Sequence, residues 1–168
     1  MKGIIYPSEG PRARTVLLPA RLDDDDDGTS GPWAEQVIVS RWFPSGHYYT
    51  RVSSIPATDF PLTNDYTIIS TSSPNAFPRN KALRERLGLS MHGNIVVLKH
   101  SSRRPLVVTN VHWAEKRMID LVVSRYVHVL HLNAFIHDSA PDSLDSVAQR
   151  LKISPSLPLS KVHVPYLH

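Results

Sequence analysis

Histidine is the side chain best suited to acid–base chemistry in this sequence, which contains nine histidines and no cysteine. A histidine exchanges protons near neutral pH, and a neighbouring tyrosine or carboxylate can orient its ring. Two pairs meet this requirement: His47 beside Tyr48, and His112 three residues before Glu115. These four residues are the catalytic candidates of a small enzyme that uses histidine as general acid or base and needs no cofactor.

A further group of histidines, His128, His131 and His137, precedes Asp138. Histidine and carboxylate side chains bind zinc. The spacing from His128 to His131 differs from the i,i+4 pair of a helical metalloprotease site, and no glutamate follows the first histidine. Because cysteine is absent, thiolate zinc sites, disulfides and a cysteine nucleophile are excluded. No nucleophile-elbow or phosphate-binding glycine pattern occurs, so we expect neither a metal site nor a cofactor.

Positive charge is concentrated in the middle of the chain. Residues 79–117 contain nine Lys or Arg against only Glu85 and Glu115, whereas residues 1–78 carry an excess of acidic residues. A basic segment can attract an acidic protein or nucleic acid, and a solvated basic face is the common alternative.

The binding candidates within this basic segment are Lys81, Arg84, Arg86, Lys99, Arg103 and Arg104. If the segment is functional, nucleic acid is the favoured acidic partner. Trp113 is the only Trp, Tyr or Phe in this segment, which argues against stacking of single-stranded bases.

Short strands and helices must position these residues. Strands are predicted at residues 2–6, 14–18, 47–52, 66–70 and 95–98, with residues 106–108 able to pair with the last of them. The first two strands form a hairpin. The segment 33–42 fits a helix or, over 36–43, a strand, and we favour the helix.

The segment 74–100 is a complete helix–turn–strand unit. Residues 80–87 are almost all good helix formers, and Leu83 and Leu87 fall on one face. Gly88 suits the left-handed position that ends many helices. The apolar run at residues 95–98 is typical of a strand that is buried on both faces.

Beyond residue 110 the pattern becomes helical. Asn110 is the predicted cap of a helix over residues 113–126, and residues 127–137 fit either a helix or a strand. An exposed apolar patch at 127–136 would favour self-association. A short helix is predicted at 143–152, followed by a proline-rich tail; together they echo a helix-turn-helix, but Pro158 would break its second helix.

The chain resembles a family of small uncharacterised proteins from basidiomycete (mushroom-forming) fungi. The matching residues are Phe77, Pro78, Asn80, Lys81, Arg84, Glu85, Gly93, Asn94, Ile95, Val96, Val97 and Lys99. The resemblance spans about residues 1–127, and its specific part is 77–99. A looser likeness exists to a phage and bacterial domain of unknown function. Neither resemblance implies a catalytic residue.

The sequence therefore predicts an α+β fold: a small, mainly antiparallel sheet with two or three short helices and a C-terminal helical extension. Residues 1–127 form the core domain and residues 128–168 the extension. The predicted function is a non-enzymatic binding module for an acidic partner or nucleic acid, with the histidine enzyme as the alternative.

No apolar segment is long enough to span a membrane, and the acidic run at 23–27 is expected to be an exposed loop. We expect an intracellular protein, cytoplasmic or nuclear, that could form oligomers.

Overall fold

The computed structural model describes residues 1–21, 31–58, 60–73 and 76–138. The chain divides into two compact units, Met1–Val127 and His128–His168, and each is described by itself. The predicted acidic loop, the helix at 143–152 and the proline-rich tail lie outside the described residues. No helix in the described part of the chain is long and apolar enough to cross a membrane.

The described elements are pairs of strands separated by helical segments. In chain order they are β1 (Lys2–Tyr6), β2 (Arg14–Leu17), the 3-10 turns η1 (Ala34–Gln36) and η2 (Ser40–Trp42), β3 (His47–Ser54), β4 (Pro61–Thr71), α1 (Lys81–Leu87), β5 (Ile95–His100), β6 (Val108–Thr109), the 3-10 turn η4 (Trp113–Glu115) and α2 (Lys116–Asp138). This order of strands and helices confirms the predicted α+β class.

The strands form one antiparallel sheet in the order β2-β1-β5-β4-β3, and β6 pairs with the end of β5. Strand β5 is central, and all four residues of its apolar run, 95–98, are fully buried. An unbroken apolar run is required here because both faces of a central strand are covered. The predicted hairpin of residues 2–6 and 14–18 is present as β1 and β2.

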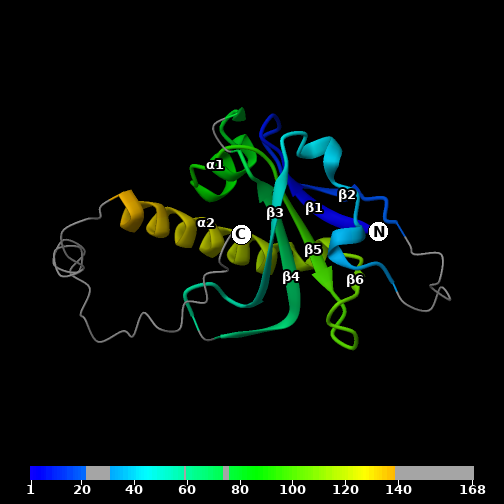
Figure 1. Cartoon of the computed structure of the whole chain (residues 1–168). Coiled ribbons are helices and arrows are strands. Elements are labelled where there is room, and N and C mark those ends of the chain that lie inside the picture. Colours follow the sequence, from blue (N-terminus) through cyan, green and yellow to red (C-terminus); the bar gives the residue numbers. More distant parts are fainter. Residues whose placement is uncertain (22–30, 59, 74–75, 139–168) are drawn as a thin grey trace. The chain divides into compact units, whose positions relative to one another are not determined.

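The two faces of the sheet have different covers (Figure 1). On one face, Ile4, Ile68 and Val97 pack with Leu83 of α1 and with Ile119 near the start of α2. The other face is covered by the segment that contains η1 and η2. The residues of this second core are Ile5, Ile69, Val96 and Leu98 from the sheet, packed against Leu18, Val37, Val39 and Phe43.

Two buried or half-buried asparagines connect α1, β1 and β5, and we call them the asparagine crossing (Asn80 and Asn94). The Oδ1 atom of Asn80 accepts the Leu83 N–H at 2.9 Å and caps α1, while its Nδ2 donates to the carbonyls of Tyr6 (2.8 Å) and Gly93 (2.7 Å). Asn94 accepts from the N–H of Ser8 at 2.8 Å and donates to the carbonyl of Trp42 at 2.9 Å. These side chains replace backbone pairing where the chain changes direction.

The segment 33–42 is neither the favoured helix nor the alternative strand. It forms the two 3-10 turns η1 and η2, joined by a stretch in which Val37 makes an isolated bridge to Ala20. The buried side chains from residue 33 to residue 43, Ala34, Val37, Val39 and Phe43, follow neither a 3.6-residue nor a two-residue period. Packing onto the sheet, rather than local periodicity, determines the shape of this segment.

The predicted cap at Asn110 is wrong. Asn110 accepts the N–H of Lys2 at 2.7 Å, and the next residue, Val111, donates its N–H to the Lys2 carbonyl at 2.9 Å. These bonds hold the chain extended beside β1. Helical structure begins with η4 at Trp113, the predicted start, and His112 rather than Asn110 is the capping residue. Helix α2 then continues to Asp138, which resolves residues 127–137 as helix and makes this helix longer than predicted.

A candidate anion-binding groove

A hollow of about 510 Å³ lies where three segments of the first unit meet, and we call it the basic groove. Its charged and aromatic lining residues are Arg12 from the turn between β1 and β2, Glu85 and Arg86 from α1, and Trp113, Lys116 and Arg117 from η4 and the start of α2. Four positive charges therefore face one carboxylate. A concave surface of this charge concentrates the field that attracts anions.

Asp120 fixes part of this surface from below. Its Oδ1 atom accepts the Tyr6 hydroxyl at 2.6 Å and also the Lys116 ammonium, and its Oδ2 lies 3.3 Å from Nε of Arg86. Burial, followed by the hydrogen bond to Asp120 and its negative charge, raises the pKa of Tyr6 far above its usual range. Tyr6 therefore donates its hydrogen bond as a neutral hydroxyl, and the negative charge of Asp120 is balanced by its ion pairs with Lys116 and Arg86.

Arg12 and Arg117 differ from these two cations. Both are exposed, and neither makes an ion pair or hydrogen bond with another residue in the described ranges. Trp113 beside them keeps 52% of its surface exposed, and the Lys116 ammonium lies 5.6 Å from the centre of its ring. The groove therefore presents two unpaired guanidinium groups next to an accessible aromatic ring.

A second hollow of about 330 Å³ adjoins the same tryptophan. Lys2, Thr15, Asn110 and His112 line it, and Trp113 is common to both hollows. In the part of the chain that the structure describes, no group of three or more His, Asp or Glu side chains is arranged to hold a metal ion. The chemistry of the two hollows is that of cation and aromatic contacts.

Of the six basic binding candidates, Arg86 alone lines the groove. Lys81 and Arg84 are exposed elsewhere on α1, and Lys99 is bound through both carboxylate oxygens of Glu115 at 3.0 Å.

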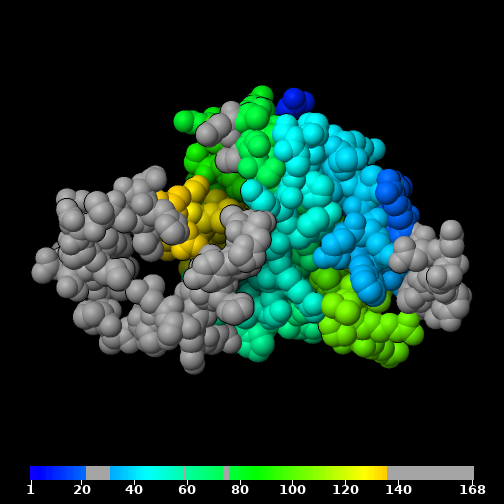
Figure 2. All heavy atoms as spheres, viewed as in Figure 1, coloured from blue at the N-terminus to red at the C-terminus, as the bar shows by residue number. Residues whose placement is uncertain are grey.

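Arg103 and Arg104 follow the end of β5, whereas α1 precedes its start, so a full strand separates these two arginines from α1. Their turn (lime in Figure 2) projects beside the light-blue segment that contains Trp33, which forms a bridge with Val107. The six candidates do not form a single patch.

The first pair of catalytic candidates points to opposite faces of β3. His47 contacts Tyr49 rather than Tyr48: its Nε2 lies 2.9 Å from the Tyr49 hydroxyl, and its ring packs on Phe43 with centroids 5.6 Å apart. Burial lowers the pKa of His47, and burial together with the charge of Glu35 raises the pKa of Tyr49. Tyr48 is exposed.

The second pair of catalytic candidates, His112 and Glu115, is in contact, but through the backbone N–H of His112 and not through its imidazole ring. The Glu115 carboxylate accepts the N–H of His112 at 2.9 Å and at the same time binds Lys99. Glu115 thereby caps η4 and anchors it to β5. The carboxylate that was expected to orient the imidazole of His112 is occupied by structural contacts.

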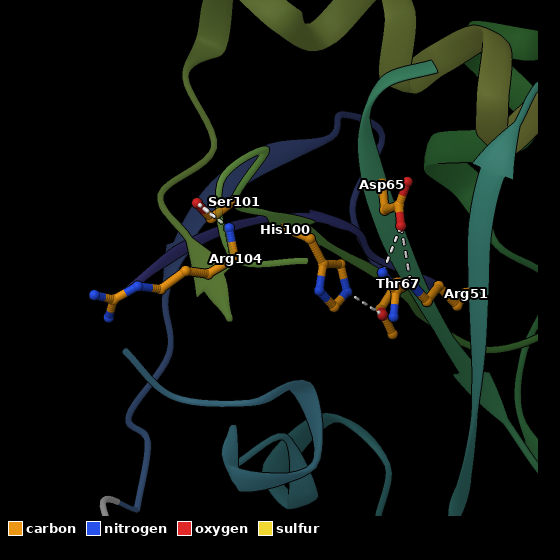
Figure 3. A network of polar contacts seen from close by, with 6 residues as sticks. All are labelled: Arg51, Asp65, Thr67, His100, Ser101 and Arg104. Carbon is orange, nitrogen blue, oxygen red and sulfur yellow. Dashed lines mark hydrogen bonds and ion pairs between the residues drawn. The ribbon is translucent and has the colours of Figure 1, made fainter. Parts of the chain in front are cut away.

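A third histidine, His100, is buried between β4 and β6. Figure 3 shows its imidazole pointing toward Thr67, with Nε2 2.7 Å from the threonine hydroxyl, while the side chain of Arg104 extends away. Burial lowers the pKa of His100, the charge of Arg51 lowers it further, and the Pro105 carbonyl opposes the change. The adjacent ion pair between Arg51 and Asp65, at 2.6 Å, completes this polar cluster.

The sequence pointed to the region of the groove but named only one of its four cations, Arg86, as a binding candidate. Lys116 and Arg117 belong to the basic segment, and Trp113 was singled out as its only aromatic residue. Arg12 lies about a hundred positions away, and only the pairing of β1 with both β2 and β5 brings its turn near α2. No local pattern indicates such a contact.

No protein-family model, curated protein or solved structure matches this chain. The residues of the groove therefore have to be interpreted from their own chemistry.

Proposed function

We propose that this protein is a non-enzymatic binding module that holds an acidic partner in the basic groove. The observation that carries the proposal is that Arg12 and Arg117 line a hollow that also contains Arg86 and Lys116, and that both are exposed and have no partner within the described ranges. Guanidinium groups bind carboxylates and phosphates through paired hydrogen bonds. The separate anchoring of Arg86 and Lys116 by Asp120 supports a preformed surface.

The arrangement of histidines favours binding over acid–base catalysis. An enzyme of the alternative type needs a hollow in which histidine meets a carboxylate or tyrosine. The hollow that contains His112 has neither among its lining residues, and the basic groove, which contains Glu85, has no histidine. His47 meets Tyr49 under the η1–η2 segment, where both side chains pack against the core.

The test is the affinity of the full chain for a fluorescein-labelled, 12-residue oligonucleotide or oligoglutamate, measured by fluorescence anisotropy. The double substitution Arg12→Ala/Arg117→Ala is expected to weaken binding about tenfold or more, since two charge-assisted contacts are lost.

The matched control is Arg84→Ala/Arg103→Ala. It removes the same charge from two exposed arginines outside the groove. If the control weakens binding as much as the groove variant, attraction is due to net charge alone and the proposal fails. It also fails if neither polyanion binds.

A further inference from the structure

The position of Trp113 narrows the choice of acidic partner. It is the one residue shared by the basic groove and the second hollow, and more than half of its surface is exposed. It belongs to η4, which Glu115 caps at its start and ties to Lys99. The backbone that carries the ring is therefore held in place, and Trp113 lines both hollows.

Both hollows contain a positive charge. Arg12, Arg86 and Arg117 line the basic groove, while Lys2 lines the second hollow. A ligand that follows both hollows would meet positive charge, then an aromatic surface, then positive charge again. A single nucleic-acid strand has this alternation, with phosphates along its backbone and flat bases between them.

We propose that a single-stranded nucleic acid crosses Trp113, with one base stacked on the indole and its flanking phosphates bound in the two hollows. This inference rests on the proposed function and names the partner of the same groove. The hollows, about 510 and 330 Å³, are of the size that holds small ligands, and together they accommodate a few nucleotides.

The alternatives leave part of this surface unused. An acidic peptide can pair with Arg12 and Arg117, but it supplies no flat ring for Trp113. A duplex presents phosphates but keeps its bases stacked inside, and α1, with seven residues, is the only described helix besides α2 at the groove. The scarcity of aromatic residues in the basic segment argued against single strands, but the exposed ring of Trp113, which lines both hollows, provides one stacking position.

The experiment compares four labelled probes of equal length: single-stranded DNA, single-stranded RNA, an abasic DNA strand, and duplex DNA. We expect each base-containing strand to bind about tenfold more tightly than the abasic strand, because stacking of one base contributes on this scale. Trp113→Ala should remove that difference and leave the affinity for the abasic strand unchanged. A preference between DNA and RNA distinguishes the two sources of the strand.

The matched control is Trp33→Ala, since Trp33 is 53% exposed and lines neither hollow. The indole N–H resonance of Trp113 should shift on addition of the strand, and that of Trp33 should not. The inference is overturned if the abasic or duplex probe binds as tightly as the single strand, or if Trp113→Ala and Trp33→Ala have equal effects. In those cases the proposed function survives as long as Arg12→Ala/Arg117→Ala weakens binding more than Arg84→Ala/Arg103→Ala does. It fails if the groove variant binds like the wild type, if the control weakens binding equally, or if no polyanion binds.

Discussion

The asparagine crossing and the basic groove both involve α1, but in different ways: Asn80 caps its start, and Glu85 and Arg86 line the groove. Asn80 is 1% exposed, and its side chain makes three hydrogen bonds to backbone groups of three separate segments. Arg12 and Arg117 in the groove are exposed and make no such bonds within the described ranges. Asn80 therefore holds the fold together, whereas the side chains of Arg12 and Arg117 are available to bind a partner.

This difference changes the meaning of the pattern at residues 77–99. Its asparagines and Gly93 form the crossing, and its apolar residues form β5 in the core. Lys99 of the same pattern is tied to Glu115. The pattern is therefore mainly a set of structural requirements, and only its outward residues, such as Glu85, reach the groove.

The largest effect on stability is expected from a substitution in the asparagine crossing. Asn80→Ala should lower the free energy of unfolding by about 3 kcal/mol, since a helix cap is lost and two carbonyls lose their donor. Urea denaturation followed by circular dichroism measures it. Lys81→Ala, at the neighbouring exposed position, should change stability by less than about 0.5 kcal/mol. Equal effects of the two substitutions would show that the crossing has no special role.

Two glycines in the same region differ in how closely they are packed. Gly93 (φ +76°) and Gly88 (φ +67°) both have left-handed backbones, but a Cβ at Gly93 would lie 2.7 Å from Thr71, whereas nothing surrounds Gly88 within 4 Å. We expect Gly88→Ala to cost about 1 kcal/mol from backbone strain alone. Gly93→Ala should cost about 1–2 kcal/mol more because of the clash. Thermal unfolding of both variants separates strain from crowding, and equal costs would contradict this packing.

The local half of the structure follows from the sequence, and the non-local half does not. Gly88 at the end of α1 and the apolar run at 95–98 follow local patterns, so their roles in α1 and β5 are predictable. Asn80 also donates to the carbonyl of Tyr6, far away in sequence, which no local pattern indicates. The turns η1 and η2 depend on the sheet that they cover, so their pattern has no clear period. Asn110 has the chemistry of a cap, but its bond to Lys2 depends on where β1 lies.

The basic groove could not be predicted from the sequence either, because it also depends on contacts between residues far apart in the chain. The sequence identified the basic segment and Trp113, yet it grouped residues that β5 separates, such as Arg86 and Arg103. It also ranked Lys99 with the available cations although that ammonium is paired. Charge counts along a chain do not reveal which cations are neutralised by partners far away in sequence.

A smaller effect is expected from pH. Burial lowers the pKa of His100, so the unfolded chain binds this proton more tightly than the folded one. The stability linked to His100 is complete above the pKa of an unperturbed histidine, near 6.5, and is lost as the pH falls through the lower folded value. Urea midpoints measured from pH 7.5 to pH 5 should decrease, and less steeply in His100→Gln. An unchanged slope in that variant would exclude His100 as a source.

The smallest effect on stability should come from the groove itself. Arg12→Ala/Arg117→Ala removes exposed side chains without partners in the described ranges, so the free energy of unfolding should change by less than about 0.5 kcal/mol. The same urea titration measures it. A loss of more than 1 kcal/mol would mean that these arginines belong to the fold, like the asparagines, and would remove the distinction between the two regions.

The salt dependence of binding tests the central claim most directly. For a single strand, each neutralised phosphate contributes about −0.7 to the slope of log Kobs against log salt concentration. Between 50 and 300 mM NaCl, Arg12→Ala/Arg117→Ala should reduce the magnitude of the wild-type slope by about 1.4, and Arg84→Ala/Arg103→Ala should leave it unchanged. A slope that is the same in the wild type and the groove variant, or is reduced equally by the control, would contradict the assignment of the partner to this groove.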